Sequence, residues 1–342
     1  MKTPPTNRWR YLVALLLLAA CTGEQSAVLR VDRQFILFPA SDSVAIHDRT
    51  IDSLTRIVDI VLHDSSLVLT DSRQRRVAQV VPGRVGKLQG RRGDGPGEFQ
   101  FPLHSDALGD RVVIGDIGNS RFQFFNREGE LIATLKSPVT IHHFALESDS
   151  TLLVAIADSV WYLARVTMRG EWHPVARRPV RQHAKGSQAP AALMRYDHLI
   201  AMLGNGSFVV FDQADGMLRE YDARGEMLRQ RSLPPDILKQ LVQARDEDMK
   251  ALSTRFGGVL TAPLIKELAG DHRGHVLLLL SASPIGGLWL DLNRNQAVSL
   301  ATDAPRRGDP LLSATAGSVS GDSIAIASFD GSVRVRRIAA PR

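Results

Sequence analysis

The chain has 342 residues, of which 44% are hydrophobic and 23% charged, and it contains a single cysteine. One cysteine excludes an intramolecular disulfide, so no disulfide framework holds this fold. The formal net charge of +6 includes Lys2, Arg8 and Arg10, and a chain beginning at residue 21 carries only +3. Half of the net charge therefore belongs to the N-terminal segment and not to the body of the protein.

The first 20 residues have the order of an export signal. A basic start precedes an apolar run, Tyr11–Ala20, which is about half the length of a membrane-spanning helix. The run ends in Leu18-Ala19-Ala20-Cys21, which resembles the lipobox of bacterial lipoproteins. That resemblance implies that residues 1–20 are removed and that Cys21 becomes the lipidated N-terminus. The alternative is an ordinary signal peptide with a chance cysteine.

The lipoprotein resemblance also predicts where the protein is. Residues 21–27 would form the lipidated N-terminus and a short tether to the membrane, and residues 28–342 the folded domain. The residue after Cys21 is Thr22. An aspartate at this position would resemble an inner-membrane retention signal, so the threonine favours the outer membrane. A protein in the cell envelope does not meet nucleic acid, so we expect no such partner.

Residues 28–342 consist mostly of short strand-forming runs separated by turn residues. The clearest unit, Asp106–Leu135, predicts three strands joined by two tight turns that contain Gly or Asn. Related units recur six times: Asp64–Val80, Asp106–Leu135, Asp149–Leu163, Gly204–Leu228, Asp271–Leu292 and Gly321–Val335. Such a repeat predicts an all-β fold, namely a β-propeller with six blades, with seven or eight blades as open alternatives.

Two segments depart from the repeat. Val28–Ile46 contains the runs Phe35–Phe38 and Ser43–Ile46, and we expect it to add an outer or closing strand to the last blade. Residues 235–256 follow Pro234-Pro235 and have an acidic start, helical apolar spacing and a glycine stop. This pattern predicts one inserted amphipathic helix, packed on a propeller face or serving as a lid or partner-binding helix.

A glycine-rich motif precedes the clearest unit. Its residues are Gly93, Gly95, Pro96, Gly97, Glu98 and Phe99. Together with the hairpin residues Asn119 and Arg121, this motif resembles the repeat of six-bladed propellers of the NHL type. The resemblance covers about residues 90–135 and implies shape more than chemistry.

No strong catalytic motif is present: the chain lacks a Gly-x-Ser-x-Gly elbow, a His-Glu-x-x-His pair, a phosphate loop and an EF-hand loop. His272 and His275 have metal-pair spacing, but a solvated turn is the favoured interpretation. His142 and His143 are adjacent and would point to opposite faces of a strand, so we expect one of them to pack within a blade.

Three residues are candidates to face a ligand: His104, Asp116 and Arg121. His104 follows the glycine-rich motif, where an inter-blade loop could reach the end of the propeller. Asp110 and Asp116 could face a calcium ion in the central channel, although capping of local turns is the favoured role.

The sequence therefore favours a lipid-anchored binding or scaffold module for a protein, peptide or glycan of the envelope, without catalytic activity. We predict no cofactor, with calcium as the candidate if a metal binds. The alternative function is a metal-dependent hydrolase or lyase, which requires side chains from several blades to converge in the central channel.

Overall fold

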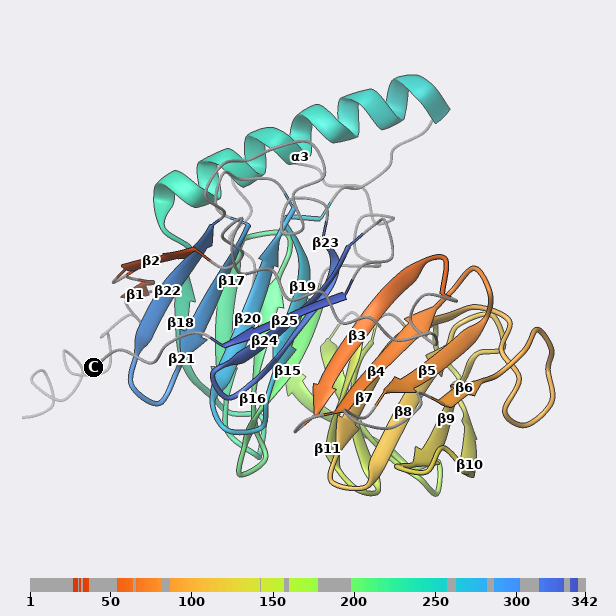
Figure 1. Ribbon diagram of the computed structural model, residues 1–342. Helices are drawn as coiled ribbons and strands as arrows, with labels where there is room; N and C mark the ends of the chain where they lie inside the picture. Colours follow the sequence, from red (N-terminus) through yellow and green to blue (C-terminus); the bar gives the residue numbers. More distant parts are fainter. Residues whose placement is uncertain are drawn as a thin grey trace, which may run out of the picture.

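Six sheets form a closed ring in the computed structural model of the chain (Figure 1). The structure describes residues 27–29, 31, 33–36, 54–63, 66–80, 87–141, 143–156, 160–177, 198–256, 263–281, 286–301, 314–328 and 333–337. Cys21, the predicted export signal before it and the start of the predicted tether lie outside these ranges. Within them, no helix combines the length and the apolar character needed to span a membrane.

Each sheet is one blade, built from consecutive antiparallel strands, and two of the sheets gain one parallel strand from the N-terminal segment. Blade one contains β3 (Ile57–His63), β4 (Ser66–Asp71), β5 (Arg76–Val80) and β6 (Lys87–Gln89). Blade two contains β7 (Pro102–Leu108), β8 (Arg111–Asp116), β9 (Arg121–Asn126) and β10 (Leu131–Lys136). Blade three contains β11 (Phe144–Ser148), β12 (Thr151–Ala155), β13 (Trp161–Thr167) and β14 (Trp172–Arg177).

The second half of the chain continues in the same order. Blade four contains β15 (His198–Gly204), β16 (Ser207–Asp212), β17 (Met217–Tyr221) and β18 (Met227–Ser232). Blade five contains β19 (Ile265–Gly270), β20 (His275–Leu280), β21 (Gly287–Asp291) and β22 (Gln296–Ala301), and blade six contains β23 (Ala314–Ser320), β24 (Ser323–Ser328) and β25 (Val333–Arg337). The predicted six-bladed propeller is confirmed.

The first strand of each blade lies at the centre of the ring. β3, β7, β11, β15, β19 and β23 contact one another in this order, and β23 also packs against β3. The units recognised in the sequence correspond to the second and later strands of each blade. The inner strands went unrecognised because polar residues interrupt them, as in the sequences IVDIVLH and FALES.

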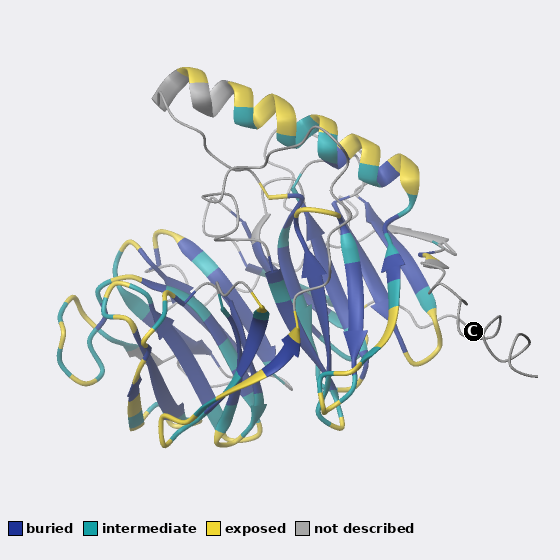
Figure 2. Cartoon of the chain, turned by 180° about the vertical axis from the view of Figure 1, so that it is seen from behind, coloured by how far each residue is buried: buried dark blue, intermediate teal, exposed yellow. Residues whose placement is uncertain are grey.

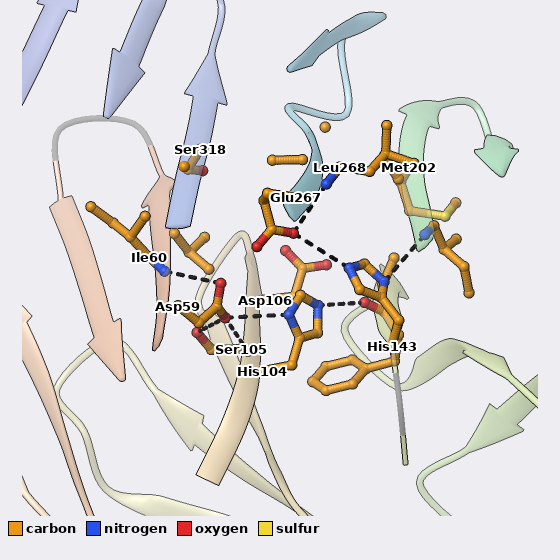
Figure 3. A pocket seen from close by; sticks show the side chains of 18 of the residues that line it. Asp59, Ile60, His104, Ser105, Asp106, His143, Met202, Glu267, Leu268 and Ser318 are labelled. Atoms are coloured by element: carbon orange, nitrogen blue, oxygen red, sulfur yellow. Dashed lines mark hydrogen bonds and ion pairs between the residues drawn. The ribbon is translucent and has the colours of Figure 1, made fainter. Parts of the chain in front are cut away.

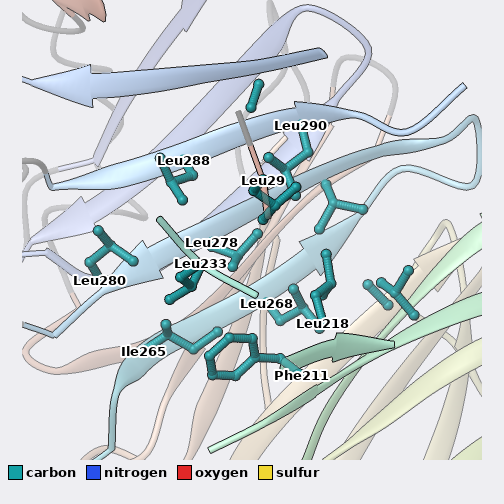
Figure 4. Packing of buried hydrophobic residues seen from close by; sticks show 14 of the residues in the cluster. Leu29, Phe211, Leu218, Leu233, Ile265, Leu268, Leu278, Leu280, Leu288 and Leu290 are labelled. Atoms are coloured by element: carbon teal, nitrogen blue, oxygen red, sulfur yellow. The ribbon is translucent and has the colours of Figure 1, made fainter. Parts of the chain in front are cut away.

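The N-terminal segment does not close the last blade, so that prediction is wrong for the part that the structure describes. β1 (Ala27–Val28) pairs in parallel with β18 of blade four, and β2 (Arg33–Ile36) pairs in parallel with β22 of blade five. Leu29, between them, is buried in the apolar cluster that blades four and five share (Figure 4). The run Ser43–Ile46 lies outside the described residues.

The predicted helix is also confirmed, as α3 (Pro235–Phe256). It follows β18 and lies across one end of the ring (Figure 1), with an exposed outer face in Figure 2. Ile237 and Leu241, four residues apart on one helix face, are buried in the same cluster as Leu29 and Leu233. Burial of these apolar side chains ties the first half of the helix to blades four and five.

Candidate metal centre in the central channel

Five titratable side chains from four blades converge on the central channel (Figure 3). They form what we call the channel cluster: Asp59 on β3, His104 and Asp106 on β7, His143 directly before β11, and Glu267 on β19. Side chains alternate along a strand, so every second residue of an inner strand points into the ring. The closed ring brings together residues that are more than 200 positions apart in the sequence.

The channel cluster lines a cavity of about 30 Å³. A cavity needs roughly 10–15 Å³ by this measure to hold a water molecule, so this one accommodates an ion or one or two waters. An organic substrate would not fit inside it. Three carboxyl groups line the cavity, and no lysine or arginine is among the described residues around it.

Two of the carboxylates are anchored to the next blade. Asp59 Oδ2 accepts hydrogen bonds from the backbone N–H and the hydroxyl of Ser105, and the latter bond is 2.6 Å long. Asp106 Oδ2 accepts a 2.6 Å hydrogen bond from the N–H of Leu146. These contacts fix both carboxylates and join blades one, two and three.

His104 is held by its surroundings in one orientation. Its Nε2 lies 2.9 Å from the carbonyl oxygen of Phe144, and its ring packs edge-on against the Phe144 ring. A carbonyl oxygen can only accept, so Nε2 carries the proton that it donates. The other ring nitrogen, Nδ1, faces Asp59 Oδ2 at 3.4 Å.

The hydrogen bonds of His143 place its proton on the same ring nitrogen but direct that nitrogen toward the carboxylate. Its Nδ1 accepts a 3.2 Å hydrogen bond from the backbone N–H of Ile200, so Nδ1 carries no proton. Its Nε2 lies 3.5 Å from Glu267 Oε1. The ring also lies against that of His104, with 4.0 Å between the centroids.

Burial weakens the charged forms of these groups. It raises the pKa of Glu267 to about 8, and repulsion by Asp59 adds to the rise. Burial likewise raises the pKa of Asp106 to about 6 and lowers the pKa of His143 to about 4. Attraction to His104 lowers the pKa of Asp106 and that of Glu267, but it does not cancel the effect of burial on either group.

Three members of the channel cluster meet the geometric requirement for a shared metal ion. One potential ligand atom from each of His104, His143 and Glu267 lies within 4.8 Å of the others. Imidazole and carboxylate are ordinary ligands of divalent transition metals. The arrangement is thus a candidate metal centre.

The other two candidate ligand-facing residues lie away from the cavity. Asp116 ends β8 and is fully buried, and its carboxylate accepts hydrogen bonds from the N–H groups of Gln100 and Phe101 and from the Asn119 amide. The two N–H groups belong to the segment before β7, and only the Asn119 contact lies in the adjacent turn, so Asp116 joins two segments and does not cap its turn through the local backbone as the sequence favoured. Neither Asp116 nor Arg121 lines the channel.

Arg121 supports the glycine-rich motif. Its guanidinium donates to the carbonyl oxygens of Asp94, Gly95 and Glu98 over 2.6–2.9 Å. Glu98 Oε2 in turn accepts a 2.8 Å hydrogen bond from the N–H of Gly95, and Gly97 has a φ of +75°, which favours glycine. We call this motif, with Asp116 and Arg121, the blade-two corner, and its contacts are structural.

The predictions for the remaining histidines and for Asp110 have different outcomes. His272 lines the cavity, whereas His275 binds Asp271 at 2.6 Å and stacks on Trp289, so the two do not form a metal pair. His143 is buried, but between blades in the channel and not within a blade as expected. His142 lies outside the described residues, and Asp110 is exposed in the turn before β8.

Sequence reasoning identified one residue of the channel cluster, His104, and missed the other four. The available signal was a titratable residue within an apolar run, as at Asp59 in IVDIVLH, and at Glu267 in IKELAG the preceding Lys266 obscures even that signal. Without knowledge of which strands lie at the centre of the ring, such a sequence cannot be distinguished from that of an irregular edge strand.

No protein-family profile matches the chain, and no curated protein is similar to it in sequence. A candidate exported protein from Bacteroides fragilis matches with a TM-score of 0.56 and 12% identity, over 91% of this chain and 100% of its own. A catalytically inactive virginiamycin B lyase from Staphylococcus aureus, with quinupristin, matches with a TM-score of 0.50 and 9% identity, over 84% and 82%. A protein of unknown function from Bacteroides thetaiotaomicron gives 0.50 and 11%, over 86% and 72%.

Identities this low extend to the fold and not to the activity. The similarity to NHL-type repeats stays a resemblance of residues 90–135. By its fold, the chain is a six-bladed β-propeller.

Proposed function

We propose that the protein is a lipid-anchored propeller of the bacterial envelope that binds one divalent metal ion at the centre of its ring. The observation that carries the metal proposal is the convergence of two imidazoles and three carboxylates around a cavity of about 30 Å³. The lipid anchor at Cys21 and the outer-membrane location rest on the lipobox resemblance.

Charge balance supports a cation in this cavity. Buried carboxylates are costly unless a positive charge or hydrogen-bond donors compensate them. Asp59 and Asp106 receive backbone donors, yet the pKa of Asp106 and that of Glu267 both stay raised. A divalent cation would supply the compensation that lysine or arginine provides elsewhere in proteins.

The ligand types favour a transition metal over calcium. Calcium takes six to eight oxygen ligands, whereas sites that combine imidazole with carboxylate suit Mn²⁺, Fe²⁺, Co²⁺ or Zn²⁺. The candidate donors are His104, His143 and Glu267, with Asp59 and Asp106 adjacent. We therefore replace calcium, the candidate from the sequence, with a divalent transition metal.

In this proposal the ion ties blades two, three and five together at their inner strands or directly before them, and so stiffens the ring. The cavity is too small for an organic molecule, so the protein, peptide or glycan partner would bind at the outside of a rigid, metal-loaded propeller. The folding free energy would then include the metal-binding free energy.

A metal-dependent hydrolase or lyase is the second candidate. The pKa values of Asp106, about 6, and Glu267, about 8, bracket neutral pH, where general acids and bases work best. The matched lyase adds nothing beyond the fold at 9% identity. An enzyme would also require the channel to open, because the cavity has no room for a substrate.

The test uses purified protein that starts at Thr22, treated with chelator and then titrated with Mn²⁺, Co²⁺, Zn²⁺ or Ca²⁺. We expect a transition metal to raise the melting temperature and calcium to leave it unchanged. An unchanged melting temperature with every metal would contradict the proposal. Metal-dependent turnover in a screen of esters and lactones would favour the enzyme, whereas crosslinking to one envelope partner would favour the binding module.

A further inference from the structure

The two histidines of the channel cluster have different protonation patterns, and this difference assigns them different roles. Both present a ring nitrogen to a carboxylate at similar distance, 3.4 Å for His104 and 3.5 Å for His143. Distance alone would therefore allow both to bind a metal. The hydrogen bonds at their opposite ring nitrogens separate them.

His104 is prepared to be a ligand through Nδ1. Its Nε2–H donates to the carbonyl oxygen of Phe144, which leaves the lone pair on Nδ1 in the neutral ring. Metal-binding histidines characteristically donate their other ring N–H to a carbonyl or carboxylate in this way. The packing of Phe144 and His143 against the ring holds Nδ1 toward the cavity.

His143 is prevented from acting as a ligand through Nε2. Its Nδ1 lone pair already accepts the N–H of Ile200, so the proton of the neutral ring must sit on Nε2, facing Glu267. A metal bond at Nε2 would require that proton to move to Nδ1. The Nδ1–H would then face the Ile200 N–H, leaving two buried donors opposed without an acceptor.

We propose that His104, through Nδ1, is the one imidazole ligand of the metal, and that His143 is a positioning residue that holds the ligand Glu267. This inference rests on the proposed metal centre. Glu267 Oε1 accepts from Leu268 N–H and from His143 Nε2–H. These two donors leave Oε2 to face the cation, while Asp59 and Asp106 stay anchored to their backbone donors and contribute charge.

Three substitutions separate a ligand from a positioning residue. Glutamine places its amide nitrogen near the position of Nε2, whereas the oxygen of asparagine lies near the position of Nδ1. His104→Gln therefore keeps the donor to Phe144 and removes the ligand nitrogen. His143→Gln keeps the donor to Glu267, and His143→Asn keeps the acceptor for Ile200 but removes that donor.

The experiment titrates Co²⁺ into the protein that starts at Thr22 and into these variants, after circular dichroism has verified folding. We expect His104→Gln to weaken Co²⁺ binding about 100-fold or more, and His143→Asn by about 10-fold, the lower end for an outer-shell partner. His143→Gln should bind within about 3-fold of the unsubstituted protein. Proton NMR of the Co²⁺ form should show a single exchangeable, hyperfine-shifted imidazole N–H, which His143→Gln retains.

Two results would overturn the inference, and they are distinguishable. Two shifted imidazole N–H signals, together with loss of binding in His143→Gln, would make His143 a ligand and leave the metal centre intact. Absence of Co²⁺ binding to the folded, unsubstituted protein would remove the metal centre itself, and with it the proposed function.

Discussion

The blade-two corner and the channel cluster both bury carboxylates, but they differ in what compensates the charge. In the corner, Asp116 lies 3.8 Å from the guanidinium of Arg121 and also accepts backbone N–H groups. In the channel, three carboxyl groups and three histidines line the cavity, and the described lining contains no lysine or arginine. The corner therefore places a guanidinium beside its buried carboxylate, whereas the described lining of the channel offers its carboxylates only histidines as cationic groups.

This comparison separates buried charge that maintains the fold from buried charge that is available for a ligand. Substitutions should therefore have opposite consequences in the two regions when no metal is bound. Removing a carboxylate should destabilise the corner, since its partners lose their acceptor. It should stabilise the metal-free channel, since it removes repulsion.

The largest effect is expected in the corner. Asp116→Ala would leave the N–H groups of Gln100 and Phe101 without their acceptor and would remove the carboxylate that lies beside the buried guanidinium of Arg121. We expect a loss of about 3–5 kcal/mol in the free energy of unfolding, measured by urea denaturation. Asp110→Ala, on the exposed turn before β8, is the control and should change it by less than about 0.5 kcal/mol. Equal effects of the two substitutions would contradict the structural role of Asp116.

The channel should respond with the opposite sign. Glu267→Gln removes a carboxylate that burial and Asp59 both disfavour. In chelator-treated protein at pH 8, we expect it to raise the free energy of unfolding by about 1–3 kcal/mol. With a transition metal present, the same substitution should lower the melting temperature relative to the unsubstituted protein. A loss of stability in both conditions would mean that Glu267 stabilises the channel without a metal, as Asp116 stabilises the corner.

These two regions also show what the sequence could predict. The corner was recognisable because its glycines, Pro96 and Glu98 stand next to one another in a local motif. The blades were recognisable because Gly and Asn mark the turns between their outer strands. The channel cluster joins Asp59 to Glu267 only after the ring closes, and a single sequence contains no signal for which inner-strand positions will meet.

The prediction that the N-terminal segment pairs with the last blade was wrong for a related reason. Its apolar runs indicated a strand, and two short strands form, but the choice of blade depends on a tertiary contact. Leu29 packs into the cluster that blades four and five share with α3. Hydrophobic burial at that site determined the partner, and strand propensity alone could not.

A contact between blades five and six can be compared with both regions. It is an ion pair between a carboxylate and a histidine, and its strength depends on pH because the histidine titrates. Asp271 Oδ2 binds His275 Nδ1 at 2.6 Å and also accepts the N–H of Gly321 in the β23–β24 turn. The hydrogen bond to Asp271 raises the pKa of His275. Its contribution is therefore full below the unfolded pKa of about 6.5 and is lost as pH rises through the folded pKa.

We expect His275→Gln to cost about 1 kcal/mol at pH 5.5 and clearly less at pH 8.5. Urea denaturation of both proteins at the two pH values measures the difference. A cost that does not change with pH would show that His275 acts through its stacking on Trp289 and not through its charge.

The smallest expected effect tests the backbone of the corner. Gly97 has a φ of +75°, and a Cβ there would meet no atom within 4 Å. Gly97→Ala should therefore cost only the conformational strain, about 1 kcal/mol. Gly97→Asn should cost less, because asparagine tolerates this region better. Thermal denaturation of the two variants would detect the order, and the reverse order would contradict the strain argument.

The most direct test of the central claim is the metal content of the protein purified without chelator. Inductively coupled plasma mass spectrometry should find close to one equivalent of a divalent transition metal per chain, and the double variant His104→Gln, Glu267→Gln should contain none. A folded, unsubstituted protein that contains no such metal, and takes up none from Mn²⁺, Fe²⁺, Co²⁺ or Zn²⁺, would show that the channel balances its charge without a cation.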